Sequence, residues 1–241
     1  MNEIFELGEG IARQELNLVF VIDNSGSMSG EKIGAVNNAI RDVMALMPEI
    51  QDDTSDAVIK INSLVFSDKA KWLYESPQSI DKFVWKDINT EGGTNLSHAY
   101  DCLSDYLCKQ SKGGKMPDLG GLAPIIILMT DGMPTSYDWE KHLIELKKKG
   151  WFKISLKYAL SIGIDSEEAM DVLVKFTGNS ETVLKVYTAE ALRKVIKVIA
   201  VTASKVKSSS RQISTNKVLN QEELAKEEIE KELEKIEDIE W

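Results

Sequence analysis

A short polar stretch follows the first strongly apolar run of the chain. Leu18 to Ile22 are five apolar residues without a polar break, and Asp23, Ser25 and Ser27 follow at alternate positions. Carboxylate and hydroxyl oxygens are hard ligands, which Mg²⁺, Mn²⁺ and Ca²⁺ prefer and which zinc and copper sites use less often. The residue types and their spacing therefore indicate a site for a divalent cation.

The same stretch is open to other interpretations. Asp, Asn, Ser and Gly dominate turns, so Asp23 to Ser27 is also compatible with an ordinary turn before a helix cap. A P-loop, a Rossmann fingerprint and a nucleophile elbow each need glycines at spacings that this stretch lacks. An aspartyl phosphotransferase would place a second acid at the position of Ser25.

Two further polar loops carry candidate ligands. Thr94 follows Gly92-Gly93 just before a helical pattern, and Asp131 follows the apolar run Pro124 to Met129. Each loop alone is weak evidence, because Gly-Gly and Asp-Gly are common in turns. An Asp directly after a buried parallel strand, however, lies at the same sheet edge as other residues in that position. The predicted metal ligands, gathered from three loops, are Asp23, Ser25, Ser27, Thr94 and Asp131.

The pattern along the chain places these loops on an α/β sheet. The predicted strands are 16–22, 57–66, 69–74, 124–129, 153–162 and 183–187, with 69–74 as an antiparallel edge strand. The predicted helices are 31–47, 96–109, 139–149, 166–176 and 189–204, with a short helix within 77–85. Strands that alternate with helices favour a doubly wound, Rossmann-like, mostly parallel sheet of six strands with helices on both faces.

Composition limits the class of protein. The 241 residues are 43% hydrophobic and carry a net charge of −10, which argues against a nucleic-acid partner. No apolar run approaches the roughly 20 residues that span a bilayer. The first ten residues hold three glutamates and no basic region, unlike a signal peptide. We therefore expect a cytoplasmic protein with no membrane contact.

The charge is unevenly distributed, which suggests an appendage. From Asn220 to Trp241 there are ten acidic residues and three lysines. We expect a main domain over 1–204, a Ser/Thr-rich linker over 205–217, and an acidic, helical tail over 218–241 that stands apart from the domain. The acidic pattern of this tail favours two interpretations equally. The tail either docks on a partner or forms a solvated, frayed helix.

The five candidate ligands also match a known pattern. A D-x-S-x-S motif, then a distant Thr, then an Asp after a strand, resembles the metal-ion-dependent adhesion site (MIDAS) of von Willebrand factor A (VWA) domains, over about Asn17 to Ser204. The resemblance implies the VWA fold and a bound Mg²⁺, with Mn²⁺ or Ca²⁺ as substitutes. It also implies a protein partner that donates an Asp or Glu carboxylate to the metal, and binding without catalysis.

A narrower resemblance concerns the region after Asp131. Residues 131–135, Trp139, 151–153 and 159–163 are similar to bacterial stand-alone VWA proteins of the tellurium-resistance (TerY-like) type. That resemblance implies a role in a stress-response or kinase–phosphatase signalling system, with a protein kinase and a PP2C-type phosphatase as partners.

A hypothesis from a different class remains open. Asp23 and Asp131 would also suit a Mg²⁺-dependent phosphohydrolase. The sequence shows no general base or phosphate-binding Lys at a fixed spacing from these acids, which disfavours that alternative.

Overall fold

The computed structural model describes residues 14–53, 57–163, 166–208, 227–229, 231–236 and 239–240. The strands within these residues are β1 (Gln14–Asp23), β2 (Ala57–Phe66), β3 (Ala70–Trp72), β4 (Gln78–Ser79), β5 (Ile125–Thr130), β6 (Leu156–Ile162), β7 (Val183–Val186) and β8 (Ile239–Glu240). The α-helices with assigned bounds are α1 (Glu31–Asp53), α2 (Leu96–Tyr106), α3 (Trp139–Lys147), α4 (Gly150–Lys153), α5 (Glu167–Thr177) and α6 (Ala189–Ser208). Short 3₁₀ helices are η1 (Gly26–Met28), η2 (Gln110–Lys112) and η3 (Ser180–Thr182).

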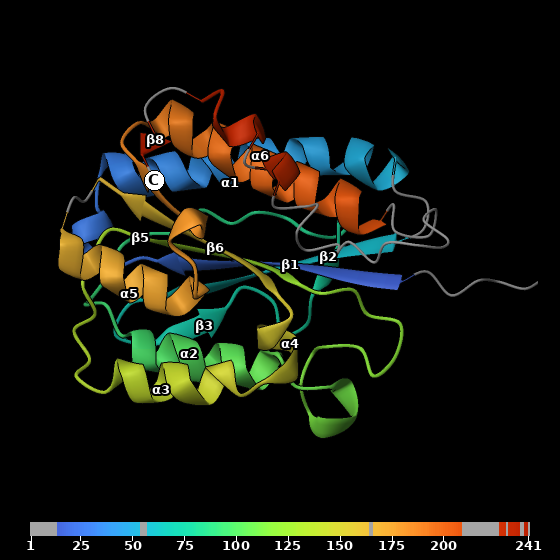
Figure 1. Ribbon diagram of the computed structural model, residues 1–241, viewed down its shortest axis with the longest axis horizontal. Coiled ribbons are helices and arrows are strands. Elements are labelled where there is room, and N and C mark those ends of the chain that lie inside the picture. The colour runs from blue at the N-terminus through green and yellow to red at the C-terminus, as the bar shows by residue number, and fades with distance from the viewer. Residues whose placement is uncertain are drawn as a thin grey trace, which may run out of the picture.

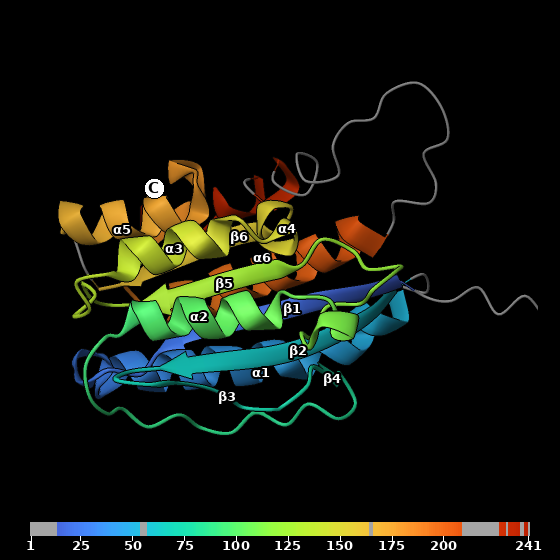
Figure 2. The ribbon, with the colours of Figure 1, turned by 90° about the horizontal axis from the view of Figure 1, so that it is seen from below.

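The strands form one mostly parallel sheet. Its order is β3-β2-β1-β5-β6-β7-β8, with β4 also paired to β2 (Figures 1 and 2). β1, β2, β5, β6 and β7 are parallel, whereas β3 and β4 run antiparallel to β2 and β8 runs antiparallel to β7. The six predicted strands and the antiparallel edge are confirmed, but the strand predicted at 153–162 begins only at Leu156, because Gly150–Lys153 form the unpredicted helix α4. β4 and β8 were not predicted, because two residues are too few to show a periodicity.

Helices cover both faces of the sheet (Figure 1). In β1, Leu18, Phe20 and Ile22 belong to the core cluster shared with α1 and α6. Val19 and Val21 belong to the cluster shared with α2, α3, α4 and α5. All five side chains are fully buried. Successive strand side chains point to opposite faces, so an unbroken apolar run marks a strand that is covered on both sides.

Helix α1 is longer than predicted, because it runs through Pro48 to Asp53. Its last turns are held by tertiary contacts: Ile50 is buried, and the Gln51 side chain bonds the Ala57 carbonyl at 2.8 Å and the Ile59 amide at 2.9 Å. These contacts with β2 offset the backbone hydrogen bond that a proline removes from a helix.

The predicted helix within 77–85 is wrong. Gln78 and Ser79 pair instead with Ile61 and Lys60 of β2 as the short strand β4. Further along, Phe83 is buried, and the Tyr74 hydroxyl donates a 2.8 Å hydrogen bond to the Val84 carbonyl. Pairing with the sheet edge overrides the local helical pattern.

The described part of the C-terminal segment packs against the domain. Residues 227–229 and 231–233 are helical, and Ile229 and Leu233 are fully buried in the cluster that α1 and α6 share. This packing differs from the separate tail that we expected, because Ile229 and Leu233 find an apolar surface within the chain. Residues 205–208 belong to α6, and the rest of the predicted linker, 209–217, lies outside the described residues. The division into 1–204, 205–217 and 218–241 therefore stays a prediction.

Candidate metal centre

Two of the candidate ligands are placed by neighbouring parallel strands. Asp23 is the last residue of β1, and Asp131 directly follows β5. The two strands pair in register with Ile22 opposite Met129. Both carboxylates therefore leave the same edge of the sheet, although they are far apart in the sequence.

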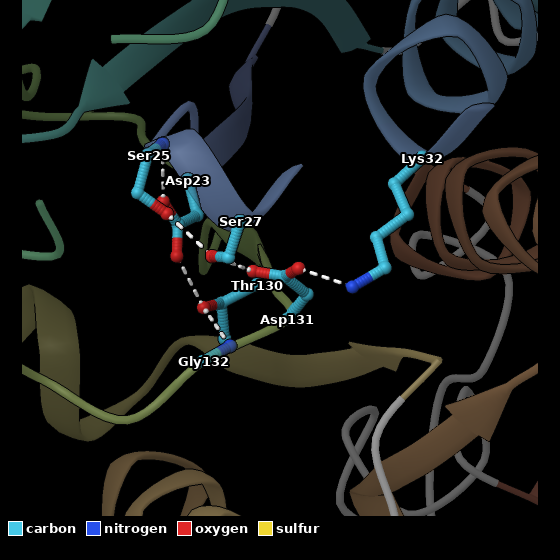
Figure 3. A network of polar contacts seen from close by, with 7 residues as sticks. All are labelled: Asp23, Ser25, Ser27, Lys32, Thr130, Asp131 and Gly132. Atoms are coloured by element: carbon cyan, nitrogen blue, oxygen red, sulfur yellow. Dashed lines mark hydrogen bonds and ion pairs between the residues drawn. The ribbon is translucent and has the colours of Figure 1, made fainter. Parts of the chain in front are cut away.

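The side chains at this edge form a continuous polar network (Figure 3). The hydroxyl oxygens of Ser25 and Ser27 lie 3.0 Å apart, and the Ser27 hydroxyl donates a 2.6 Å hydrogen bond to Oδ1 of Asp131. On the other carboxylate, Oδ1 of Asp23 accepts from the Ser25 amide at 2.7 Å, and Oδ2 accepts from the Thr130 hydroxyl at 2.5 Å. Four of the five predicted residues are thus in one connected cluster.

Thr94 reaches the same region from the loop before α2. A Cβ placed on Gly132 would lie 3.7 Å from the Ser27 Oγ and 3.7 Å from the Thr94 Oγ1, so both hydroxyls border one small space. The backbone of Thr94 is fixed to the loop after β5, since its carbonyl accepts from the Thr135 amide at 2.8 Å. Its own amide donates to the Thr135 hydroxyl at 3.2 Å. The structure therefore brings together all five sequence-predicted residues.

The loop that carries Thr94 is braced on both sides. Gly92 adopts a φ of 61°, which favours glycine, and its carbonyl accepts a 2.9 Å hydrogen bond from the Gly26 amide. Gly93 donates its amide to Oδ1 of Asp68 at 2.8 Å, and Asn95 donates its side-chain amide to the Asp68 carbonyl at 3.1 Å. A glycine at position 92 is therefore needed for the course of this loop, and Asp68 holds the loop in place.

Burial has the largest effect on the pKa of the Asp23 carboxyl. The side chain is fully buried, and this burial raises the pKa of the Asp23 carboxyl above its usual value. Hydrogen bonds from Thr130 and Ser25 act in the opposite direction, and the nearby Asp131 charge raises the pKa further. Two neighbouring buried carboxylates repel each other and lose their hydration, so the arrangement is electrostatically unfavourable unless a cation lies close to both.

Sequence reasoning missed two members of the network. Thr130 bonds Asp23, and its place was readable from the parallel pairing of β1 with β5. Lys32 forms an ion pair with Oδ2 of Asp131. Lys32 is the second residue of α1, where the helix dipole disfavours a positive charge. A lysine at this unfavourable position indicates, from the sequence alone, that a nearby acidic group compensates for the repulsion.

The chemistry of this set suits a hard divalent cation. Its donors are carboxylate and hydroxyl oxygens, and two carboxylates formally balance one divalent charge. Within the described part of the chain, no group of three or more His, Cys, Asp or Glu residues is placed to hold a metal. A cation here would therefore depend on the hydroxyls. His98 follows Thr94 by four residues, but its Nδ1 accepts a hydrogen bond from the Ala70 amide at 2.9 Å. That nitrogen is therefore not a further ligand for the cation.

The chain belongs to the von Willebrand factor type A domain family, whose pattern matches residues 17–198. It is similar to human inter-alpha-trypsin inhibitor heavy chain H4, with 34% identity over 134 residues. The match covers 53% of this chain and 13% of that relative. The chain thus spans only a small part of the length of the curated relatives that it matches.

Solved structures share the fold at low identity. The pilus adhesin SpaC from Lactobacillus rhamnosus GG has a TM-score of 0.57 at 14% identity, covering 76% of this chain and 30% of that chain. Proximal thread matrix protein 1 from the mussel byssus has a TM-score of 0.54 at 16% identity, covering 80% of this chain and 46% of that chain. The latter structure is described as having a zinc-occupied MIDAS motif.

Proposed function

We propose that this chain is a non-enzymatic, divalent-metal-dependent protein-binding or scaffold module. One Mg²⁺ ion, or Mn²⁺ or Ca²⁺ in its place, would bind among Asp23, Ser25, Ser27, Thr94 and Asp131. A partner protein would complete the coordination shell with an Asp or Glu carboxylate. VWA domains are typically interaction modules, and the zinc-occupied MIDAS of the mussel protein supports a metal at the corresponding place in the fold.

The observation that carries this proposal is the convergence of oxygens from three loops. The Ser25, Ser27 and Asp131 oxygens follow one another at 3.0 and 2.6 Å, and the Thr94 hydroxyl borders the same space. The hydroxyls are neutral, so an ion bound through them keeps positive charge for an incoming ligand. A cage built from carboxylates alone would repel an acidic partner.

A comparison of Thr94→Ala with Thr94→Ser tests the proposal. The described hydrogen bonds of Thr94 use its amide and carbonyl, which alanine keeps, so we expect Thr94→Ala to remain folded. A partner retained by the wild type in Mg²⁺ should be released by chelator. It should be lost from Thr94→Ala and kept by Thr94→Ser. Retention of the same partner by Thr94→Ala would contradict the proposal.

We also infer a bacterial stress-response or kinase–phosphatase context and a cytoplasmic location. These inferences rest on the resemblance to tellurium-resistance proteins. None of the helices within the described residues has the length and apolar character needed to cross a membrane. Co-purification with a protein kinase or a PP2C-type phosphatase, in Mg²⁺ but not in chelator, tests the assignment. Absence of both enzymes from material purified in Mg²⁺ would contradict the signalling context, whereas co-purification that persists in chelator would contradict the metal dependence of the contact.

One observation keeps the phosphohydrolase alternative worth testing. Lys32 lies beside Asp131, and its ammonium would attract the negative charge of a phosphate. Against this alternative, Asp23 is fully buried and both of its oxygens accept hydrogen bonds, so it is a poor nucleophile. Assays with phosphomonoesters and nucleotides in Mg²⁺ and Mn²⁺ should show no turnover. Robust turnover that Asp23→Ala abolishes would overturn the binding assignment.

A further inference from the structure

Lys32 brings a second positive charge to the candidate metal site. Its ammonium forms an ion pair with Oδ2 of Asp131 (Figure 3). The Asp131 side chain is fully buried, whereas the Lys32 side chain is 35% exposed. The Lys32 Cε would lie 3.5 Å from a Cβ placed on Gly163, so the side chain extends from α1 toward the end of β6. The pair joins α1 to the loop after β5.

The position of Lys32 on its helix is electrostatically unfavourable. The amino end of a helix carries partial positive charge, so a lysine in the first turn of α1 is repelled by the helix dipole. The Asp131 carboxylate compensates for that repulsion. The same carboxylate is a proposed cation ligand, so the ammonium and a divalent cation draw on one negative charge.

We propose that Lys32 is a tethered competitor of the divalent cation, which lowers the metal affinity of the free site. This inference rests on the proposed metal-binding function and adds a control on how the site is loaded. Asp23 and Asp131 together with Lys32 sum to one negative charge. A bound divalent ion changes this to one positive charge, and a partner carboxylate then brings the site to neutrality. Without Lys32, the metal alone would neutralise the two carboxylates.

An opposing effect of Lys32 has to be weighed. Groups that support a metal ligand from outside usually strengthen metal binding, and their loss commonly lowers affinity about 10–100-fold. Asp131, however, has a second support, because the Ser27 hydroxyl bonds its Oδ1 at 2.6 Å. Its side chain is also fully enclosed by protein. Loss of Lys32 therefore leaves the carboxylate oriented, and the change in charge decides the sign.

Calorimetric titration of the full chain with Mg²⁺ and Mn²⁺ tests this role. Lys32→Met removes the charge and keeps most of the stem, whereas Lys32→Arg keeps a charge at the same place. We expect Lys32→Met to bind Mg²⁺ about tenfold more tightly than wild type, and Lys32→Arg to bind within about threefold of it. Lys148→Met removes an exposed lysine that pairs with Glu145 on α3, and should change the affinity less than about twofold.

A second readout is the melting temperature in chelator and in Mg²⁺. Lys32→Met should melt lower than wild type in chelator, because Asp131 loses its partner, and should gain more from added Mg²⁺. Lys32→Gln serves as a second neutral variant if Lys32→Met does not fold. If wild type binds the metal and the folded neutral variant binds it equally or more weakly, the competitor role of Lys32 is overturned and the metal site itself stands. Absence of binding by wild type and all variants would overturn the metal site itself.

Discussion

The Ser27 hydroxyl donates a 2.6 Å hydrogen bond to Oδ1 of Asp131, 104 residues further along the chain. The contact joins the loop after β1 to the loop after β5, and these two strands lie side by side in the middle of the sheet. It places a neutral oxygen and a charged oxygen side by side, where the proposed ion would contact both. The arrangement depends on the sheet, because neither loop holds both groups.

Asp68 should control metal binding without being a ligand. Its Oδ1 accepts from the Gly93 amide at 2.8 Å and so fixes the loop that presents Thr94. We expect Asp68→Ala to weaken Mg²⁺ binding about tenfold, as is common for groups that position a ligand. Asp68→Asn removes the same charge but keeps an acceptor oxygen, and should bind nearly as wild type. Equal affinities of the two variants in calorimetry would show that charge, and not loop position, is responsible.

The C-terminal segment should contribute to the stability of the domain. Leu233 is fully buried in the core cluster of α1 and α6, so Leu233→Ala should lower the free energy of unfolding by about 2–5 kcal/mol. Glu232→Ala is the matched control. Glu232 is partly exposed and pairs with Lys235 at the surface, so its loss should change stability by less than about 1 kcal/mol. Denaturant unfolding of both variants gives the comparison. An unchanged midpoint for Leu233→Ala would restore the idea of an independent tail.

His142 should make stability depend on pH. The hydrogen bond to Asp101 of α2, at 2.6 Å, raises the pKa of His142 above its usual value of 6.5, with a further contribution from Asp138 and partial opposition from burial. Because the pKa is higher in the folded than in the unfolded protein, this stabilisation is complete below about pH 6.5. It is lost as the pH rises through the folded-state pKa.

Urea unfolding at about pH 5.5 and about pH 9 measures this effect. The wild type should lose more stability between the two conditions than His142→Gln, which cannot gain a proton. Parallel losses in the two proteins would assign the pH dependence to other groups.

The central architecture was predictable from the sequence because local patterns and sheet geometry agree there. The apolar run before Asp23 and the run before Asp131 both mark strands covered on two faces, and parallel strands bring their carboxyl ends to one edge. The meeting of Asp23, Ser25, Ser27 and Asp131 follows from that geometry, whereas Thr94 reaches them through contacts of its own loop with Asp68 and Thr135. Metal binding itself remains a prediction.

The features that sequence reasoning missed depend on contacts between distant segments. Lys32 is recognisable as a partner of Asp131 only when α1 is placed against the end of the sheet. The burial of Ile229 and Leu233 depends on a surface formed by α1 and α6, which the pattern of an acidic segment does not reveal. The continuation of α1 through Pro48 depends on the hold of Gln51 on β2.

The most direct test of the account is calorimetric titration of wild type, Asp23→Ala and Asp42→Ala with Mg²⁺ and Mn²⁺. Asp42 lies half exposed on α1, where it pairs with Arg193, so Asp42→Ala matches the charge change of Asp23→Ala away from the site. We predict that wild type and Asp42→Ala each bind one ion with similar affinity, and that Asp23→Ala binds it far more weakly or not at all. Absence of cation uptake by the wild type even with a partner present, or equal affinity in Asp23→Ala, would contradict the metal-dependent binding function.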